Sequence, residues 1–361
     1  MPDIFFVLCI AAIGGFIGHK FKLPVGGMLG AIAAVLAFNL LFEPGFYLPV
    51  YFRVALQLSF GPLIGSRVTK EDLIGLKKLA FPAAVMVICM LCLNVTFGII
   101  MYRISDLDIV TSLFATAPGG MMDMTIISAD LGANYVYVAL IQLSRTMFVI
   151  TCMFPFYQKA LIKLKTGGVA SVQADSPSIT PEGRPPEPSS IKRKAIRFFS
   201  TAFCGCFLGL VFWNLNIPAG AIIGALIGGA AFNVITGNGY FPPRLRLPMQ
   251  IFAGSFIGAG MDRQSLLAMG EVIVPIVIVV FYVIIITVTT AYIVHKLTGM
   301  DAFTSLMATT PGGLGEMSML ADGLKVDMPK VVVMHMARLM SVIILFPFIL
   351  SFIIWLIALL Q

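Results

Sequence analysis

The sequence has 361 residues, of which 59% are hydrophobic and 11% charged, with a mean hydropathy of +0.98. An ordinary soluble domain carries about 25% charged residues, so the composition excludes a chain whose main solvent is water. The net charge of +7 fits basic loops that face an anionic lipid leaflet. We therefore expect an all-α integral membrane protein.

Apolar runs follow one another along the chain, and most approach the roughly 20 residues that a bilayer-spanning helix needs. The first run lacks a basic start and a small-residue cleavage site, so we expect it to be retained as a helix. Six runs in the first half are followed by six in the second: residues 4–18, 25–42, 48–65, 79–101, 110–127 and 136–156, then 198–213, 219–235, 247–260, 272–294, 303–320 and 331–360.

One hydrophilic stretch, residues 159–197, separates the two halves. Its prolines are interspersed with Ser, Gly and charged residues, which is typical of a disordered or extended linker. The sequence therefore predicts a first membrane repeat at residues 1–158, a Pro-rich linker at 159–197 and a second membrane repeat at 198–361.

A ten-residue motif occurs once in each half. ATAPGGMMDM at residues 115–124 returns as ATTPGGLGEM at residues 308–317. Each residue of the second copy lies 193 positions after its equivalent in the first. This constant spacing indicates an internal duplication, which is frequent in secondary transporters. Four pairs of equivalent residues share one offset of 193 positions: Pro118 and Pro311, Asp123 and Glu316, Gln142 and His335, and Arg145 and Arg338.

The basic residues constrain the topology, because Lys and Arg in short loops mark the cytoplasmic side. Basic clusters lie at residues 20–22, at 67–78 and in the linker. Placing all three inside puts the amino terminus outside, and it requires one of the two runs between residue 101 and the linker not to cross. The run that Pro118, Gly119 and Gly120 interrupt is the candidate.

Each half of that interrupted run has about ten residues and would rise about 15 Å, half the thickness of the hydrocarbon layer. We therefore expect a re-entrant hairpin in each repeat, about ten crossing helices and two inverted repeats. The alternative is a broken helix that crosses the bilayer, which gives about twelve spans and parallel repeats.

The Pro-Gly-Gly turns are the candidate binding site. Proline lacks a backbone donor and glycine accepts unusual dihedral angles, so unpaired backbone groups there need protein or a water-filled cavity around them. The start of the second half-helix favours an anion, whereas the alternative is a simple packing kink. The candidate substrate- or ion-binding residues are Thr116, Pro118, Gly119, Gly120, Asp123, Gln142, Arg145, Thr309, Pro311, Gly312, Gly313, Glu316, His335 and Arg338.

Arg145 and Arg338 indicate the substrate class, because a guanidinium group suits a carboxylate or a phosphate. Asp123 and Glu316 either bind an ion or form structural salt bridges to these arginines, and the sequence leaves both roles open. His335 is able to titrate with a coupled proton. Its equivalent Gln142 is not, which favours a hydrogen-bonding role.

We expect no metal or cofactor, and no enzymatic activity. The three histidines lack the spacing of metal ligands. All six cysteines lie in apolar runs, where we expect them to be small buried hydrophobic residues.

The repeated A-T-x-P-G-G-x-x-[D/E]-M motif, followed by a polar-x-x-Arg pair, resembles the duplicated bacterial membrane family named AbrB. The resemblance covers essentially the whole chain. The family has been labelled both a regulator of gene expression and an ammonia monooxygenase. The resemblance implies a multi-pass protein of the bacterial inner membrane with an architecture like that of secondary transporters.

We therefore expect a secondary active transporter that carries a small organic anion, coupled to a proton or sodium, by alternating access. The alternative is a membrane-embedded sensor or regulator that affects gene expression indirectly. The expected partners are the lipid bilayer, the anion and the coupling ion, with no direct nucleic-acid contact and with the linker in the cytoplasm. The sequence leaves open whether two copies form a homodimer.

Overall fold

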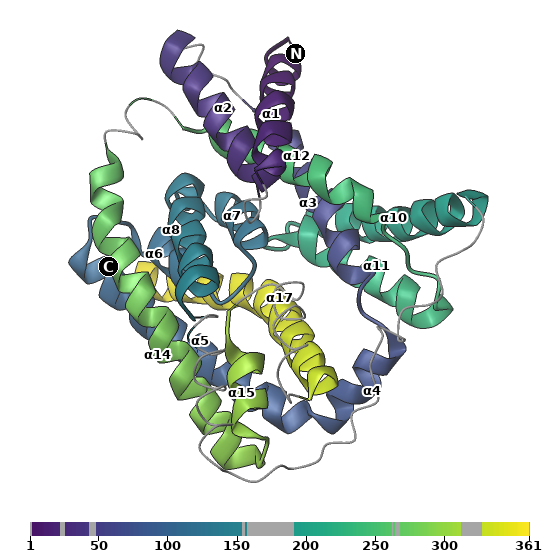
Figure 1. Cartoon of the computed structure of the whole chain (residues 1–361), viewed down its shortest axis with the longest axis vertical. Helices are drawn as coiled ribbons and strands as arrows, with labels where there is room; N and C mark the ends of the chain where they lie inside the picture. The colour runs from purple at the N-terminus through teal and green to yellow at the C-terminus, as the bar shows by residue number, and fades with distance from the viewer. Residues whose placement is uncertain are drawn as a thin grey trace.

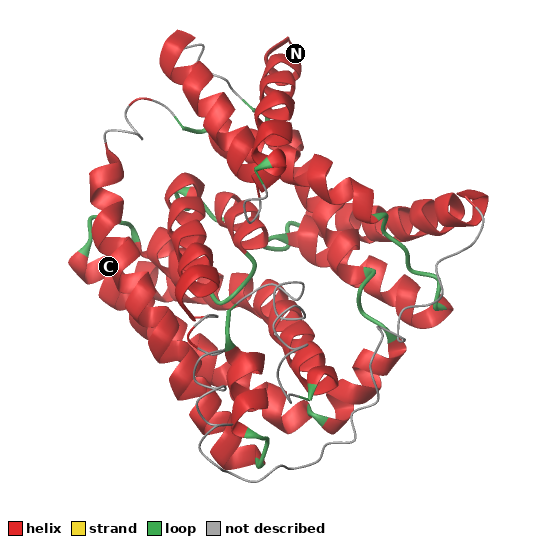
Figure 2. Cartoon of the chain, viewed as in Figure 1, coloured by secondary structure: helices red, strands yellow, loops and turns green. Residues whose placement is uncertain are grey.

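The computed structural model describes residues 2–21, 26–42, 48–153, 156, 191–261, 263, 268–311 and 327–360. Within these ranges the chain is helical and contains no strand, as Figure 2 shows, which confirms the all-α prediction. The first half consists of α1 (Pro2–Lys20), α2 (Gly26–Phe42), α3 (Val50–Gly65), α4 (Lys70–Lys78), α5 (Ala80–Ile104), α6 (Ile109–Thr116), α7 (Met121–Asp130), α8 (Tyr135–Phe148) and the π-helical turn η1 (Val149–Met153). The second half consists of α10 (Ile191–Asn214), α11 (Gly220–Thr236), η2 (Pro243–Leu245), α12 (Arg246–Ala259), η3 (Ala268–Val272), α14 (Ile273–Thr298), α15 (Ala302–Thr309) and α17 (Met328–Leu360).

The helices form three groups (Figure 1). In the first group, α1 and α2 pack against α12, and in the second, α10 and α11 pack against α3. The third group, which we call the core, contains α5 to α8 together with α14, α15 and α17. We call the first two groups the scaffold. Each scaffold group combines two helices of one half with the third helix of the other half.

Glycines allow close packing within the scaffold. A Cβ atom at Gly61 of α3 would lie 2.4 Å from the Cβ atom of Ala225 in α11. At Gly254 of α12, a Cβ atom would lie 2.7 Å from that of Ala31 in α2. Small residues at such contacts let two helix backbones approach closely, so both groups depend on glycine at equivalent positions.

Two asparagines reinforce the exchange of helices between the halves. Asn39 of α2 donates hydrogen bonds of 3.2 and 2.9 Å to carbonyl oxygens at the end of α12. Asn233 of α11 donates bonds of 2.9 and 2.8 Å to carbonyl oxygens after the end of α3. Because the last carbonyls of a helix have no partner within it, each half completes the end of a helix in the other half.

In the core, α5 and α14 pack in antiparallel directions. The hydroxyl of Thr290 donates to Sγ of Cys89 at 3.5 Å, and the rings of Phe97 and Tyr282 lie 5.1 Å apart. The residue of α5 that is later in the sequence therefore contacts the residue of α14 that is earlier, so the two helices run antiparallel. Cys89 and Tyr282 are equivalent positions of the two repeats, as are Phe97 and Thr290.

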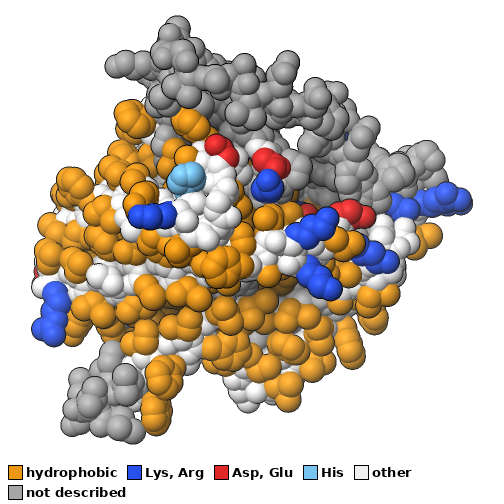
Figure 3. All heavy atoms as spheres, turned by 90° about the horizontal axis from the view of Figure 1, so that it is seen from below, with side chains coloured by type: hydrophobic (Ala, Val, Ile, Leu, Met, Phe, Trp, Pro, Cys, Tyr) orange, Lys and Arg blue, Asp and Glu red, His pale blue; other side chains and the backbone are white. Residues whose placement is uncertain are grey.

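Five helices of the described residues are long and apolar enough to cross a membrane: those at Ala80–Ile104, Tyr135–Met153, Lys192–Asn214, Gly270–Thr298 and Lys330–Ile353. Large side chains such as Phe203, Phe281 and Phe352 are 70%, 61% and 59% exposed. Figure 3 shows a face of the molecule on which hydrophobic side chains predominate. Contact of such a surface with water is unfavourable, whereas lipid tails would suit it, so the fold is that of a multi-pass membrane protein.

Three details differ from the sequence prediction. Helix α10 begins at Ile191, so the end of the predicted linker is helical, and residues 157–190 lie outside the described part. Lys and Arg at this end are good helix formers. The basic segment after α3 forms the short helix α4, which begins with a capping box of Thr69 and Asp72.

The third difference concerns the cysteines. The prediction that all six are buried is wrong, because Cys9, Cys92 and Cys152 are exposed, and Cys89, Cys204 and Cys206 are only partly buried. On a helix that faces lipid, a small apolar side chain incurs no hydrophobic penalty on the outside.

Candidate functional site

The first Pro-Gly-Gly segment breaks its run into the two half-helices α6 and α7, with residues 117–120 between them. The backbone N–H of Asn134, which follows α7, donates to the hydroxyl of Thr111 in the first turn of α6 at 2.8 Å. A straight helical segment of this length would place these ends about 35 Å apart. The segment therefore turns back on itself and forms a hairpin with its tip at residues 117–120.

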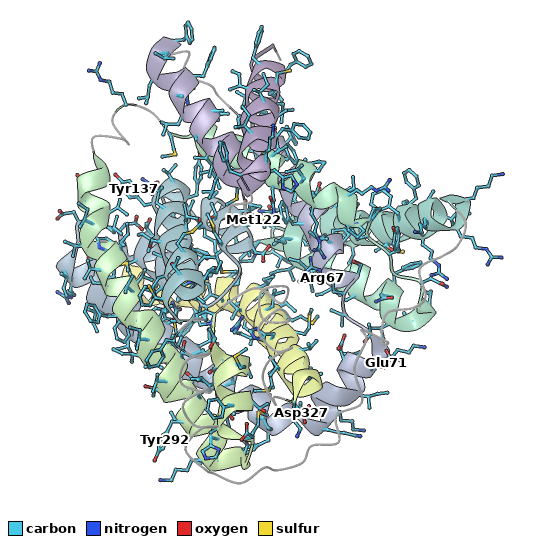
Figure 4. The ribbon with its side chains drawn as sticks, viewed as in Figure 1. Arg67, Glu71, Met122, Tyr137, Tyr292 and Asp327 are labelled. Atoms are coloured by element: carbon cyan, nitrogen blue, oxygen red, sulfur yellow. The ribbon has the colours of Figure 1, made fainter. Side chains whose placement is uncertain are left out.

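The second repeat has the same arrangement where it is described. Helix α15 ends at Thr309, and the N–H of Asp327 lies 3.4 Å from the hydroxyl of Thr304. Asp327 (labelled in Figure 4) and Thr304 are the equivalents of Asn134 and Thr111. Pro311 is buried, whereas the predicted site residues Gly312, Gly313 and Glu316 lie outside the described residues.

Helix α8 holds the first tip. Arg145 donates from Nη1 to the carbonyl oxygen of Ala117 at 2.6 Å and from Nη2 to that of Gly119 at 2.8 Å. Gln142 donates from Nε2 to the carbonyl oxygens of Phe114 and Ala117, at 2.8 and 3.1 Å. These side chains bind the carbonyl oxygens of Ala117 and Gly119 in the turn, and Gln142 adds a second bond to that of Phe114, which also accepts from the N–H of Ala117.

Helix α17 holds the described part of the second tip in the same way. The ring Nε2 of His335 lies 3.0 Å from the carbonyl oxygen of Met307, and Arg338 donates from Nη1 to that of Thr310 at 2.9 Å. The bonds from Gln142 to Phe114, Arg145 to Ala117, His335 to Met307 and Arg338 to Thr310 all span 28 positions. The duplication therefore extends to individual hydrogen bonds.

Both ring nitrogens of His335 have partners. Nδ1 lies 2.9 Å from Nη2 of Arg338, and an arginine only donates. Nδ1 therefore accepts, and Nε2 carries the proton that it donates to Met307. A second ring proton would break the bond with Arg338 and place two positive charges together, so the surroundings of His335 favour its hydrogen-bonding role.

Threonine and asparagine side chains support the half-helices from behind. Asn94 of α5 donates from Nδ2 to the hydroxyl of Thr116 at 2.8 Å and to the carbonyl oxygen of Leu113 at 3.1 Å. Thr309 lies at the equivalent place and donates to the carbonyl oxygen of Thr287 at 3.3 Å. Thr116 and Thr309 were predicted as binding residues, but in this structure their hydroxyls face neighbouring helices.

Asp123 lies in the first turn of α7 and is buried. Between the described residues Asp123 and Arg145 no ion pair forms, so the salt bridge considered from the sequence is wrong for the first repeat. The positive charge that acts on Asp123 is that of Arg67, between α3 and α4. Figure 4 labels Arg67 and Met122, the residue before Asp123.

The glycines of the first tip provide space rather than unusual dihedral angles. Gly120 has φ −72° and ψ 141°, a conformation that any residue adopts. The φ of Gly119 is not positive either. A Cβ atom at Gly120 would lie 2.4 Å from Oδ2 of Asp123, and one at Gly119 would lie 2.7 Å from the side chain of Met124. Pro118 is buried beside them.

A polar cluster that the sequence analysis missed links the scaffold to the core. Nε of Arg53 in α3 lies 2.7 Å from Oδ1 of Asp130 at the end of α7. Gln57 donates to the other oxygen of this carboxylate. Arg53 and Gln57 recur as Arg246 and Gln250 at the offset of 193, which is the signal that would have identified them.

The family profile described as "Transition state regulatory protein AbrB" matches residues 2–162 and again residues 160–354. The chain belongs to the AbrB family. Two matches of an AbrB profile along one chain agree with the paired hydrogen bonds of the two tips. No solved structure matches the chain.

Two curated proteins are similar to this AbrB-family chain over nearly its whole length. "Uncharacterized protein YhjN" of Bacillus subtilis (strain 168) is 26% identical over 370 residues, which cover 96% of this chain and 92% of that protein. "Putative regulator AbrB" of Escherichia coli (strain K12) is 25% identical over 350 residues, which cover 96% of this chain and 95% of that protein.

Proposed function

We propose that this chain is a secondary active transporter of the bacterial inner membrane, which carries a small organic anion by alternating access, coupled to a proton or sodium. The observation that carries the proposal is the antiparallel contact between α5 and α14, which occupy the same place in the two repeats. Two equivalent helices that pack antiparallel are related by a pseudo-two-fold axis perpendicular to both of them. In a membrane, such an axis supports inverted repeats, the architecture of many secondary transporters.

The depth of the first tip supports re-entrant hairpins. Helix α8 begins at Tyr135, level with the open end of the hairpin, and Arg145 reaches the tip from ten residues further along. Ten helical residues rise about 15 Å, which is half of the roughly 30 Å hydrocarbon layer. This distance supports a tip near the midplane, where many transporters bind substrate.

The two arginines support an anionic substrate. Arg145 and Arg338 come from different repeats, and each donates a hydrogen bond to the carbonyl oxygen that follows the first half-helix of its own hairpin. Arg145 uses two of its five N–H groups on carbonyl oxygens. The remaining donors of a buried guanidinium fit a carboxylate or a phosphate.

Alternating access would move the core against the scaffold. The ion pair between Arg53 and Asp130 spans this boundary, so it belongs to the contacts that such a motion changes. Asp123 is the described carboxylate nearest the first tip, and it is our candidate for the coupling proton or sodium.

Reconstitution of the purified chain into liposomes tests the proposal. Thermal shift first selects anions that stabilise the protein, because a ligand of the folded state raises the melting temperature. Uptake of such an anion should follow an imposed proton or sodium gradient and should be lost in Arg145→Gln. Arg103→Gln, at the exposed end of α5, is the control that should transport normally. Anion binding without gradient-driven uptake would contradict transport.

The relative named as a regulator favours one alternative, a membrane-embedded regulator that acts on gene expression indirectly. We propose no enzymatic step and no direct nucleic-acid contact for this chain, and both functions are compatible with a homodimer. Expression profiles of cells that carry Arg145→Gln distinguish the two functions. A regulator independent of transport would keep its effect on expression in this variant.

A further inference from the structure

Tyr282 is a large polar residue that is fully buried in the core. It lies in the middle of α14 and is 1% exposed, and its hydroxyl has no hydrogen-bond partner among the described residues. A buried hydroxyl without a partner costs free energy, so native structures seldom contain one without a reason. A ligand that is bound during function would provide such a reason.

The neighbours of Tyr282 place it where the two repeats meet. It shares a packed cluster with Ile141 of α8, Ala308 of α15 and Ala337 of α17. Ile141 lies one helical turn before Arg145, and Ala337 directly precedes Arg338. The phenol ring, which lies 5.1 Å from that of Phe97 in α5, therefore belongs to a cluster that also contains residues of α8 and α17, the helices that hold the two tips.

The charges around the hydroxyl indicate what binds there. Arg145 and Arg338 lie on α8 and α17, close in sequence to Ile141 and Ala337, which belong to the same buried cluster as Tyr282, and the charges of both arginines act on the Tyr282 side chain. Nε of Arg145 is also buried without a hydrogen-bond partner among the described residues. Two guanidinium groups repel a cation, so the ligand that suits the Tyr282 hydroxyl is an anion.

We propose that the hydroxyl of Tyr282 donates a hydrogen bond to an oxyanion, a carboxylate, phosphate or sulfate group, that binds between Arg145 and Arg338. This inference rests on the proposed function and adds a binding residue from α14. The equivalent position in the first repeat is Cys89, whose Sγ already accepts a bond from Thr290. The tyrosine donor therefore exists once, and it makes a site with pseudo-two-fold symmetry bind its ligand in one orientation.

The test compares Tyr282→Phe with the wild-type chain, both purified in detergent. The probes are succinate, inorganic phosphate and sulfate, with chloride at equal ionic strength as the control. Tyr292→Phe removes a hydroxyl from an exposed tyrosine of the same helix (Figure 4) and is the matched control variant. Thermal shift gives the melting temperature without probe, and titration gives the affinity for each probe.

At least one probe should stabilise the wild-type chain and Tyr292→Phe equally. In Tyr282→Phe the affinity for it should fall about tenfold or more, because one hydrogen bond to a charged ligand is lost. Without probe, Tyr282→Phe should melt at the same or a higher temperature, since the variant buries no unpaired hydroxyl. The probe that stabilises identifies the oxyanion as a carboxylate, a phosphate or a sulfate.

Three results would overturn the inference. The first is unchanged affinity in Tyr282→Phe, which leaves the transporter proposal standing if uptake is retained. The second is a lower melting temperature of Tyr282→Phe without probe, because the hydroxyl then has a structural partner. The third is a wild-type chain that none of the three probes stabilises; gradient-driven uptake of another anion would then still support the transporter.

Discussion

Arg145 donates from Nη1 to the carbonyl oxygen of Ala117 at 2.6 Å, across 28 positions of sequence. Arg338 makes the equivalent bond to Thr310 at 2.9 Å. Inside a membrane, the carbonyls at a helix end and in a turn must find partners within the protein. The arginines that we propose for the anion therefore also hold the hairpin tips in place.

The first prediction concerns Asp123 and Arg145. Because they form no ion pair, the effects of Asp123→Asn and Arg145→Gln on the free energy of unfolding should add to within about 0.5 kcal/mol. Arg145→Gln alone should cost about 2–3 kcal/mol, since two carbonyls lose a bond to a charged donor. Denaturation of the single and double variants in detergent measures these values. If the double variant regained several kcal/mol of unfolding free energy, the result would indicate a salt bridge between the two residues and would contradict this prediction.

The second prediction separates charge from shape at Arg145. Arg145→Lys keeps the charge but loses the planar fork of donors. A single ammonium group cannot donate to two carbonyls and an anion with the same geometry. We expect anion affinity to fall at least about tenfold, with a loss of stability of about 1–2 kcal/mol. Thermal shift with and without the anion measures both. Wild-type affinity in Arg145→Lys would limit the role of the guanidinium to its charge.

The sequence predicted the hairpins because proline and glycine interrupt an apolar run at one point in each repeat. The predicted run at residues 110–127 corresponds to α6 and α7, which together span residues 109–130. The spacing of Gln142 and Arg145 placed both side chains on one face of α8. Both features depend on residues that are close together in the sequence, so they can be recognised without the structure.

Long-range relationships were not predictable in this way. The exchange of α3 and α12 between the halves depends on contacts such as that of Asn39 with the end of α12, 219 positions away. Tyr282 was missed for a different reason. Comparison of the repeats selects residues that match, and the equivalent of Tyr282 is Cys89.

The third prediction compares the two glycines of the first tip. In Gly120→Ala the new methyl group would displace the buried carboxylate of Asp123, whereas in Gly119→Ala it would meet the flexible side chain of Met124. We expect Gly120→Ala to cost about 1–3 kcal/mol, and Gly119→Ala less. Gly270→Ala, where no atom lies within 4 Å, is the control. Melting temperatures in the opposite order would refute this account of the tip.

The fourth prediction concerns the ion pair between Arg53 and Asp130. Their side chains are 23% and 20% exposed, so Asp130→Asn should change stability by only about 0.5–1 kcal/mol. Transport should respond more strongly, because the pair joins α3 of the scaffold to α7 of the core. In a variant without native cysteines, Arg53→Cys and Asp130→Cys joined by a short thiol cross-linker should stop uptake, and a reductant should restore it. Full uptake in the cross-linked protein would exclude motion at this boundary.

The last prediction is the topology. With both termini outside and the linker inside, the first hairpin enters from the outside and the second from the inside. Asp106 precedes the first hairpin and Lys296 the second, and both are exposed. On a background without native cysteines, an impermeant maleimide added to intact cells should label Asp106→Cys. It should label Lys296→Cys, and Ser171→Cys in the linker, only after the cells are opened.

The three labelling sites distinguish the two topologies because the alternative changes two of them. If each Pro-Gly-Gly segment crossed the membrane, the first repeat would contain an even number of spans, and the linker and Lys296 would lie outside together with Asp106. The hydrogen bond between Asn134 and Thr111 opposes this, since it brings the ends of α6 and α7 together. Labelling of Lys296→Cys from outside would therefore contradict the inverted repeats, and with them the argument from α5 and α14 for alternating access.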